Sequence, residues 1–290
     1  MVFGEENLAG ANAVLSLLTD KIGAEFFDKA GPGLQIVANY AVGYDNIDVA
    51  EAARRKIFVT NTPGGFVEAV AEHTLALTLA VAKRLVEADK YMREGKFVCW
   101  QPDLMMGSQL YGKEFGVVGL GRIGSYAAKV AHFGFSMQIL YYSHKPNMEV
   151  EAQMGGMFFD NLDDLLKRAD VVSLHVPLND ETRHMIGAPQ LYMMKKSAIL
   201  INTARGAIAD EAALVTALKE GWIAGAGMDV YEEEGKGSGV NPELLKLNNV
   251  VLTPNCASAT LEARASMAEI AAQNIIDTLS GKKPRDLVNG

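Results

Sequence analysis

The stretch Val117-Val118-Gly119-Leu120-Gly121-Arg122-Ile123-Gly124 decides the fold of this chain. It ends an apolar run typical of a buried strand, and a helical pattern follows over Ser125–His132. In a G-x-G-x-x-G turn the first glycine allows the tight bend, the second lets a pyrophosphate approach the backbone, and the third lets the helix pack closely on the strand. The alternative is a purely structural glycine-rich turn. The flanking strand and helix favour a dinucleotide-binding site, with the helix N-terminal N–H groups facing the phosphates.

Outward from this turn, short apolar runs alternate with helical patterns such as Asn161–Arg168 and Asp210–Glu220. Such alternation predicts an α/β fold, a parallel sheet with helices on both faces. The runs expected to form its strands are Phe115–Gly119, Met137–Tyr142, Val171–Val176, Ala198–Asn202, Ala224–Val230 and Val250–Thr253.

Both ends of the chain contribute a second domain. A helix apolar nearly all round is expected from Val67 to about Met92, buried between two domains. Thr62-Pro63 and Thr253-Pro254 mark the two crossings, which predicts a continuous domain over 64–254 and a discontinuous one from 1–63 and 255–290. The elements expected in the second domain are strands at Ala13–Leu18, Leu34–Ala38 and Ile57–Thr60, and a helix at Leu261–Leu279.

Composition excludes several classes of protein. The 290 residues are 49% hydrophobic and 21% charged, with a net charge of −8, which argues against disorder and against a nucleic-acid partner. No apolar run reaches the roughly 18 residues of a membrane span, and the first seven residues lack the pattern of a secretory signal. Cys99 and Cys256 stand in no metal-ligand spacing. We therefore expect a cytoplasmic protein with no metal site and no membrane partner.

The residues after the second strand of the dinucleotide unit indicate which cofactor is bound. NAD binders carry an Asp or Glu about 20 residues past the glycines, to bind the ribose. Here Ser143, His144 and Lys145 occupy this turn. Without a carboxylate to repel a 2′-phosphate, and with groups able to bind one, the turn favours NADP over NAD. The alternative is an exposed polar turn without selectivity.

The order of motifs along the whole chain resembles the D-isomer-specific 2-hydroxyacid dehydrogenases, most closely their glyoxylate/hydroxypyruvate reductase branch, from about Ala13 to Leu287. The motifs are Val42–Asp48, Gly119–Gly124, His175–Leu178, Ile201–Gly206, Gly227–Glu234 and Leu252–Pro254. The resemblance implies a Rossmann-type doubly wound parallel sheet for the cofactor, and a smaller, discontinuous flavodoxin-like domain for the substrate. It also implies NAD(P)H-dependent reduction of a small 2-keto acid, and a homodimer formed through the cofactor domain and the helix after Val67.

The resemblance also assigns site residues. Arg205 matches the catalytic arginine, whose planar fork suits a carboxylate and a carbonyl oxygen. The N–H groups of Val42 and Gly43 match a second grip on the carboxylate, and Glu234 matches the acid that pairs with the family's histidine. Asp229 matches a residue that meets the nicotinamide amide. Further cofactor contacts are implied, besides the glycine turn and Ser143–Lys145, for Thr74, His175, Val176, Pro177, Thr203, Ala204, Arg205 and Ala257.

Two departures from the family pattern stand out. Asn255 occupies the position of the catalytic histidine, and an amide cannot deliver a proton, so we expect a slow reductase unless Glu234 acts through a water. His73, His144 and His175 lie at no matching catalytic position and are expected to be structural or peripheral. The alternative is an NAD(P)-binding sensor or interaction protein without useful turnover. The second departure is a short start, which implies a substrate domain without its usual first strand and helix.

Overall fold

The computed structural model describes residues 8–235 and 239–289, and the chain divides into two compact units. The central unit is Val67–Ser258, and the second combines Met1–Phe66 with Ala259–Gly290. The central unit extends a few residues past the expected boundary at 254, because the backbone N–H groups of Cys256 and Ala257 bind the carboxylate of Asp229 within it. The expectation about a secretory signal concerns residues 1–7, which lie outside the described residues.

A seven-stranded, wholly parallel sheet forms the middle of the central unit, in the order β10-β9-β8-β7-β4-β5-β6. The predicted parallel-sheet α/β fold is confirmed. Its strands are β4 (Glu114–Val118), β5 (Gln138–Tyr142), β6 (Met157–Phe159), β7 (Val171–Leu174), β8 (Ile199–Asn202), β9 (Gly225–Met228) and β10 (Val250–Leu252). The edge strand β6 was not predicted, because three residues are too few for a periodic pattern to show.

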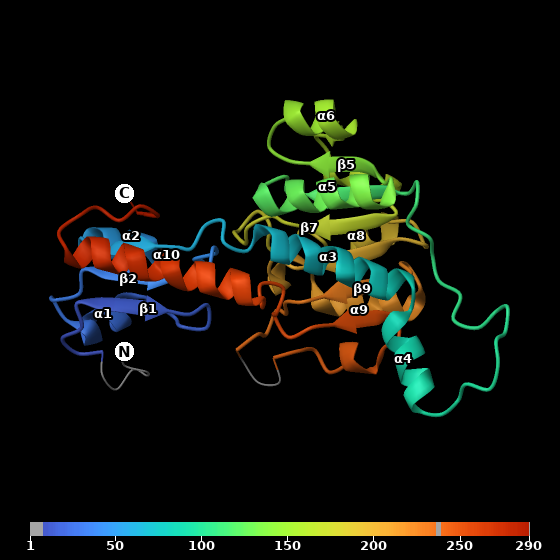
Figure 1. The fold of residues 1–290 in the computed structure, drawn as a ribbon, viewed down its shortest axis with the longest axis horizontal. Helices are drawn as coiled ribbons and strands as arrows, with labels where there is room; N and C mark the ends of the chain where they lie inside the picture. The colour runs from blue at the N-terminus through green and yellow to red at the C-terminus, as the bar shows by residue number, and fades with distance from the viewer. Residues whose placement is uncertain (1–7, 236–238, 290) are drawn as a thin grey trace. The chain divides into compact units, whose positions relative to one another are not determined.

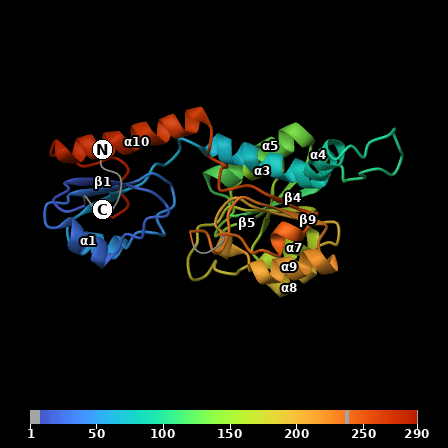
Figure 2. The ribbon, with the colours of Figure 1, turned by 90° about the horizontal axis from the view of Figure 1, so that it is seen from below.

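Helices cover both faces of this sheet. Figure 2 shows α3 and α5 on one face and α7, α8 and α9 on the other. Alternate strand residues serve the two faces: Val117 belongs to the core under α3 and α5, and Val118 to the core under α7, α8 and α9. Burial on both faces explains why the strands are continuous apolar runs. The helices are α3 (Val67–Ala82), α4 (Leu85–Arg93), α5 (Arg122–Phe135), α6 (Met148–Met154), α7 (Leu162–Arg168), α8 (Ala188–Met193) and α9 (Glu211–Glu220), with short 3₁₀ turns at Gly206–Ile208 and Leu244–Lys246.

The single helix expected from Val67 to about Met92 is two helices. The chain breaks at Arg84, whose φ of 53° is left-handed and ends the helical path. Before the break, α3 is apolar and packs on α5, β8 and β9. After it, α4 has no buried residue. The prediction of one buried helix was therefore wrong, because only α3 has a sheet to cover.

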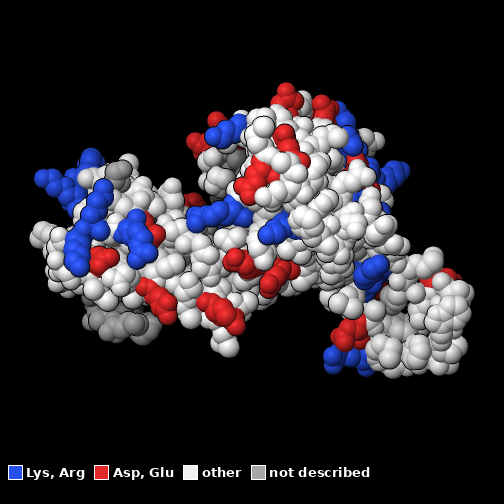
Figure 3. Space-filling view, turned by 45° about the horizontal axis from the view of Figure 1, so that its top comes forward, with Lys and Arg blue, Asp and Glu red and all other residues white. Residues whose placement is uncertain are grey.

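Beyond the break, α4 and residues 94–113 form an arm that carries exposed apolar side chains. Figure 1 shows this segment leaving the body of the central unit, and Figure 3 shows few charged groups over the tip of the arm, at the lower right. The exposed large apolar residues of the arm are Leu85, Val86, Met92, Phe97, Val98, Trp100, Met106 and Tyr111. Exposed apolar side chains gathered on one segment make the arm a candidate interaction surface.

The second unit is a smaller α/β layer with a three-stranded parallel sheet in the order β1-β2-β3. The long helix α10 packs on β1 and β2, and the strand β2 is buried throughout. In the described sheet β1 has β2 as its neighbour and forms an edge. No helix among the described residues is both long and apolar enough to span a membrane. The elements are β1 (Ala13–Ser16), α1 (Ala24–Ala30), β2 (Ile36–Asn39), α2 (Val49–Arg54), β3 (Phe58–Thr60) and α10 (Leu261–Leu279).

Candidate active site

The predicted site residues of the central unit mostly follow the carboxyl ends of its strands. The glycine turn follows β4, the Ser143 turn β5 and His175 β7, while Arg205, Asp229 and Asn255 follow β8, β9 and β10. Because the sheet is wholly parallel, these segments emerge at one edge. That edge contains the point where the strand order reverses, on either side of β4, which is where open α/β sheets bind ligands.

The glycine turn is shaped as the sequence predicts. Gly119 has a φ of 98°, and a Cβ there would lie 2.8 Å from the backbone N of Val176 on the neighbouring turn. A Cβ at Gly124 would lie 2.3 Å from the carbonyl oxygen of Gly119, so helix and strand pack without space for a side chain. A Cβ at Gly121 would meet nothing within 4 Å, which leaves open space over the turn.

The N-terminus of α5 completes this cradle. Gly121 is its N-cap, and no side chain of the described residues caps the helix. The first N–H groups of a helix have no partner within the helix, and with the helix dipole they favour an anion. The open space at Gly121 and these amides therefore fit the pyrophosphate of a dinucleotide.

The turn after β5 contains the residues expected at the ribose. The carbonyl of Tyr142 accepts the N–H of Gly119 at 2.9 Å, which places this turn beside the glycine turn. Ser143 Oγ donates to the carbonyl of Lys145 at 2.7 Å, and His144 and Lys145 are exposed. The turn therefore presents a hydroxyl, an imidazole and an ammonium group, with no carboxylate from Ser143 to Lys145.

After β7, His175 is held in the neutral form. Its backbone N–H donates to the carbonyl of Val118 at 2.8 Å, and its Nε2 lies 2.8 Å from Ser173 Oγ. Burial lowers the pKa of His175 to about 4, since the charged imidazolium loses its hydration there. Val176 and Pro177 continue past the glycine turn, and Pro177 is exposed. His175 is therefore no proton donor near neutral pH, and its contact with the cofactor stays a prediction.

Arg205 is positioned by a compact turn after β8. The side chain of Asn202 accepts the N–H of Ala204 at 3.1 Å and donates to the carbonyl of Arg205 at 2.9 Å. The guanidinium Nη1 donates to the carbonyl of Ala204 at 2.8 Å. A Cβ at the following Gly206 would lie 1.9 Å from the carbonyl carbon of Tyr231, so only glycine lets this turn meet the turn after β9.

Thr203 links this turn to α3. Thr203 Oγ1 and Thr74 Oγ1 lie 3.0 Å apart, and Thr74 Oγ1 also donates to the carbonyl of Val70. Thr74 is fully buried. Thr203 is only partly buried, and the expected cofactor contacts of both threonines stay predictions.

Asp229 anchors the segment that follows β10. Its side chain is 1% exposed, and its two oxygens accept the N–H groups of Cys256 and Ala257, each at 2.9 Å. Thr253 Oγ1 donates to Oδ1 at 2.5 Å. Burial acts to raise the pKa of Asp229, but the hydrogen bonds from His73, Thr253 and the two amides outweigh it and leave the pKa below its ordinary value. The carboxylate is thus engaged by groups of the chain itself, and the expected contacts of Asp229 and Ala257 with the cofactor stay predictions.

Asn255 and Glu234 are brought together, as the family pattern implies for a histidine and its acid. Asn255 Nδ2 donates to Glu234 Oε1 at 2.6 Å. The backbone of Asn255 has a φ of 50°, a left-handed conformation that Asn tolerates better than most residues, and its N–H donates to the carbonyl of Asp229 at 2.8 Å. The carboxylate thus orients the amide, with the NH₂ group toward Glu234.

His73 belongs to this network, although sequence reasoning placed it at no catalytic position. Its Nε2 lies 3.0 Å from Thr253 Oγ1 and 3.4 Å from Asp229 Oδ1. Ligand-type atoms of His73, Asp229 and Cys256 lie within 4.8 Å of one another, the spacing of a possible metal site. The hydrogen bonds that Asp229 already accepts account for the cluster without a metal. Its only sequence signal was the position of His73 on α3, directly before Thr74.

In the second unit, Val42 and Gly43 lie in a loop whose carbonyls are held. Asn61 Nδ2 donates to the carbonyl of Val42 at 2.8 Å, and Asn39 Nδ2 to the carbonyl of Gly43 at 2.7 Å. Asn39 is itself fixed by Ser16 Oγ at 3.0 Å. Because a trans peptide directs its N–H opposite to its C=O, the held carbonyl of Val42 directs the N–H of Gly43 the other way.

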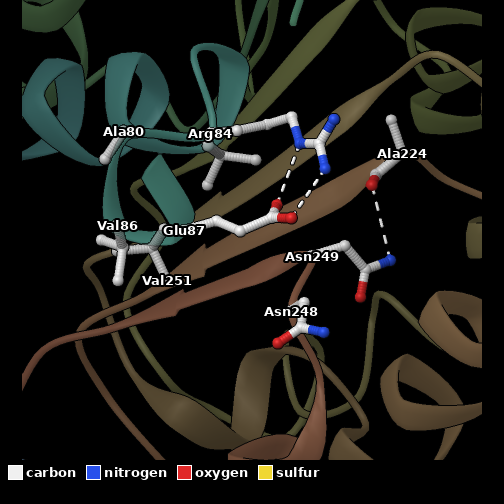
Figure 4. A pocket seen from close by; sticks show the side chains of 9 residues that line it. Ala80, Arg84, Val86, Glu87, Ala224, Asn248, Asn249 and Val251 are labelled. Atoms are coloured by element: carbon white, nitrogen blue, oxygen red, sulfur yellow. Dashed lines mark hydrogen bonds and ion pairs between the residues drawn. The ribbon is translucent and has the colours of Figure 1, made fainter. Parts of the chain in front are cut away.

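A cavity of about 360 Å³ lies elsewhere in the central unit. Figure 4 shows the Arg84–Glu87 ion pair and the side chains of Asn248 and Asn249 around it. Ala224 and Asn249, in its wall, precede β9 and β10. The cavity is therefore at the amino edge of the sheet, opposite the edge with Arg205 and Asn255.

The parallel sheet, its glycine turn and the open N-terminus of α5 define a nicotinamide-dinucleotide-binding protein. Residues 75–257 match the family model described as D-isomer specific 2-hydroxyacid dehydrogenase, NAD binding domain. The chain belongs to this family, as the sequence motifs predicted.

Individual proteins and solved structures are similar to this chain over nearly its whole length. A glyoxylate reductase of Korarchaeum cryptofilum (strain OPF8) is 52% identical over 287 residues, 98% of this chain and 84% of that protein. The crystal structure of the TT0316 protein from Thermus thermophilus is 43% identical with a TM-score of 0.91, over 98% of this chain and 88% of that one. An acyclic imino acid reductase in complex with NADPH and D-Arg is 32% identical with a TM-score of 0.86, over 98% and 87%.

Proposed function

We propose that this protein reduces a small 2-keto acid of the glyoxylate or hydroxypyruvate type to the 2-hydroxy acid with NAD(P)H. The observation that carries the proposal is the arrangement of one sheet edge, where the glycine turn, Arg205 and the Asn255–Glu234 pair all follow strand ends. The relative at 52% identity is named a glyoxylate reductase, which supports the same substrate class.

The nicotinamide cofactor would supply the hydride when bound. The turn Gly119–Gly124 and the first amides of α5 would hold its pyrophosphate. We propose a preference for NADP, because Ser143, His144 and Lys145 offer hydrogen bonds and positive charge to a 2′-phosphate.

Arg205 is the proposed grip on the acid. Its guanidinium can donate to the substrate carboxylate and to the carbonyl oxygen, whose charge grows as hydride arrives at the adjacent carbon. The turn that fixes Asn202 and Gly206 limits how far Arg205 can move. The backbone N–H groups of Val42 and Gly43 are the proposed second grip on the carboxylate.

Asn255 limits the rate in this proposal. General acid–base catalysis contributes about 10²–10⁴-fold, or roughly 3–5 kcal/mol of the barrier, and Asn255 offers no titrating proton. It can still donate a hydrogen bond to a substrate oxygen. A water held by Glu234 is the remaining route for a proton.

The same pair favours a second candidate function, a sensor or interaction protein that binds NAD(P) without useful turnover. Asn255 takes the place of the histidine beside Glu234, but its amide has no proton to transfer. Cofactor binding does not depend on this pair, since the glycine turn lies after a different strand.

We also propose a homodimer in the cytoplasm. The exposed apolar arm, with Val98 86% and Trp100 79% exposed, is the surface a second copy would cover. Both cysteines are free thiols, which fits a reducing compartment. A Trp100→Ser variant is expected to lower the dimer fraction in sedimentation velocity, whereas exchange of the exposed Tyr192 for Ser is the control.

The test compares the protein with its Asn255→His variant. Each is mixed with NADPH or NADH and a panel of 2-keto acids, and cofactor absorbance is followed. We expect slow turnover of glyoxylate or hydroxypyruvate, tighter binding of NADPH than NADH, and a gain of about 10²–10⁴-fold in the variant. Asn248→His, exposed at the other edge of the sheet, is the control. Cofactor binding without turnover in either protein would contradict the reductase proposal, and a strong NADH preference would contradict the assignment of Ser143–Lys145.

A further inference from the structure

The site lacks the group that reduction of a ketone needs. Hydride addition to a 2-keto acid converts the carbonyl oxygen into an alkoxide, which must take up a proton. The chain has five histidines, and in the described structure none is bonded to Asn255 or Glu234. Four of them are hydrogen-bonded elsewhere: His73 to Thr253, His132 to the carbonyl of Met137, His175 to Ser173 and His184 to Glu232. The fifth, His144, lies in an exposed turn.

Other acids near the segment after β10 are equally unsuited. The hydroxyl of Tyr231 donates to the carbonyl of Thr253 at 2.8 Å, and burial raises its pKa well above the ordinary value. Burial likewise raises the pKa of the Cys256 thiol. Both groups therefore hold their protons at neutral pH more firmly than ordinary side chains of their kind.

The Asn255–Glu234 pair has the polarity for a cation. A histidine in the charged form would cancel the charge of Glu234, but an amide leaves the pair with a net charge of −1. Because Nδ2 faces the carboxylate, the acceptor Oδ1 of Asn255 faces elsewhere, and it receives no hydrogen bond within the described residues. An amide oxygen next to a carboxylate repels the negative charge of a developing alkoxide, whereas it attracts a cationic N–H donor.

We propose that the site is built for a 2-imino acid in its protonated form, the iminium that a small 2-keto acid forms with ammonia or a primary amine. This inference rests on the proposed function, because it uses the same cofactor turn and the same grip by Arg205 on the carboxylate. The difference is at C2, where an iminium nitrogen replaces the carbonyl oxygen and its N–H is directed to Asn255 Oδ1. The iminium nitrogen is already protonated, so its reduction does not need the proton donor that Asn255 cannot replace.

The chemistry balances without a general acid. The keto acid and the amine first condense in solution with loss of water, and the resulting imine takes up a proton from water to become the iminium. Hydride from the reduced nicotinamide dinucleotide then adds to C2, the C2–N π bond breaks, and its electron pair becomes the lone pair of the amine. The iminium is reduced, the dinucleotide is oxidised, and the neutral amine takes a proton from water afterwards. No negative charge develops on the atom beside Asn255.

The experiment supplies glyoxylate or pyruvate alone and with increasing ammonia or methylamine, together with NADPH. Cofactor absorbance gives the rate, and mass spectrometry separates amino-acid from hydroxy-acid product. We expect the rate to rise with amine by about 10²-fold or more over keto acid alone, the factor a missing acid costs the ketone. The nitrogen-containing product should dominate.

Two variants test the roles of the pair. Asn255→His should raise reduction of the keto acid and lower reduction of the iminium, because an imidazolium repels the cation. Glu234→Gln should lower iminium reduction, because it removes the negative charge that attracts the cation, and Glu233→Gln, the neighbouring exposed carboxylate, is the control. Opposite movements on two substrates in one protein cannot arise from misfolding.

The outcomes separate the two proposals. A rate that ignores amine, with hydroxy acid as product, overturns the imino-acid inference and leaves the reductase intact. Activity that appears only in Asn255→His, on keto acid, also overturns the inference. Absence of both activities in both proteins, with NADPH bound, overturns the proposed function itself.

Discussion

Replacing Asp229 by Asn should detach the segment that carries Asn255. The exchange keeps the shape of the side chain but removes its charge and one acceptor oxygen. Asp229 is 1% exposed and accepts two backbone N–H groups and the Thr253 hydroxyl. An amide must turn its NH₂ toward one of the two N–H groups, those of Cys256 and Ala257, and leave that group unpaired.

The magnitude follows from these contacts. An unpaired buried N–H costs about 1–3 kcal/mol, and the remaining hydrogen bonds lose the assistance of the charge. We therefore expect the free energy of unfolding to fall by about 2–4 kcal/mol. Urea unfolding followed by circular dichroism measures it, and hydrogen exchange of residues 253–258 reports the local release. Asp160→Asn, an exposed aspartate of the same unit, is the control.

The pH dependence provides an independent check. The pKa of Asp229 in the folded chain lies below its ordinary value. Its contribution to stability is thus present above the unfolded pKa and is lost as pH falls through the folded pKa. The difference between wild type and Asp229→Asn should shrink in acid. A loss no larger than that of Asp160→Asn, or a difference that persists unchanged at the lowest pH, would refute the reasoning.

Three further predictions concern the proposed site. Gly124→Ala places a Cβ 2.3 Å from a carbonyl oxygen and should weaken NADPH binding about tenfold or more, as measured by fluorescence titration. Gly134→Ala in the same helix should not weaken binding, because its Cβ meets nothing within 4 Å. Arg205→Lys should lower kcat/KM for the keto acid by about 10–10²-fold, because one charge-assisted hydrogen bond is lost. The control is Arg183→Lys at an exposed position. Unchanged kinetics would show that Arg205 does not belong to the site. Ser143→Asp should shift the ratio of NADPH to NADH affinity toward NADH, because a carboxylate repels a 2′-phosphate, and an unchanged ratio would show that this turn does not read the ribose.

The local patterns of the sequence were sufficient for most elements. The helix at Leu261–Leu279 has the expected bounds, and each expected strand of the central sheet is present with ends that differ by one or two residues. These elements are predictable because parallel strands buried on both faces need continuous apolar runs. The glycine turn was predictable for a related reason, since the close approach at Gly124 excludes any side chain.

The break at Arg84 and the edge strand β6 depended on long-range packing. Lys83 and Arg84 are acceptable helix residues, and nothing in their local pattern marks an end. The helix ends there because the sheet that α3 covers ends, and α4 continues without a buried face. The strand β6 exists because β5 offers it an unpaired edge.

The residue types at the candidate site, Arg205, Glu234 and Asn255, were determined by the sequence and its resemblance. The resemblance also implied that Glu234 pairs with position 255, but the direction of the Asn255 amide, with Nδ2 toward Glu234, was decided by the tertiary structure, because the two residues follow different strands. His73 on α3 meets Thr253, 180 positions away, only when helix and sheet pack together. Likewise Asp229 is an internal anchor because the turn after β10 folds over its carboxylate and excludes water from it.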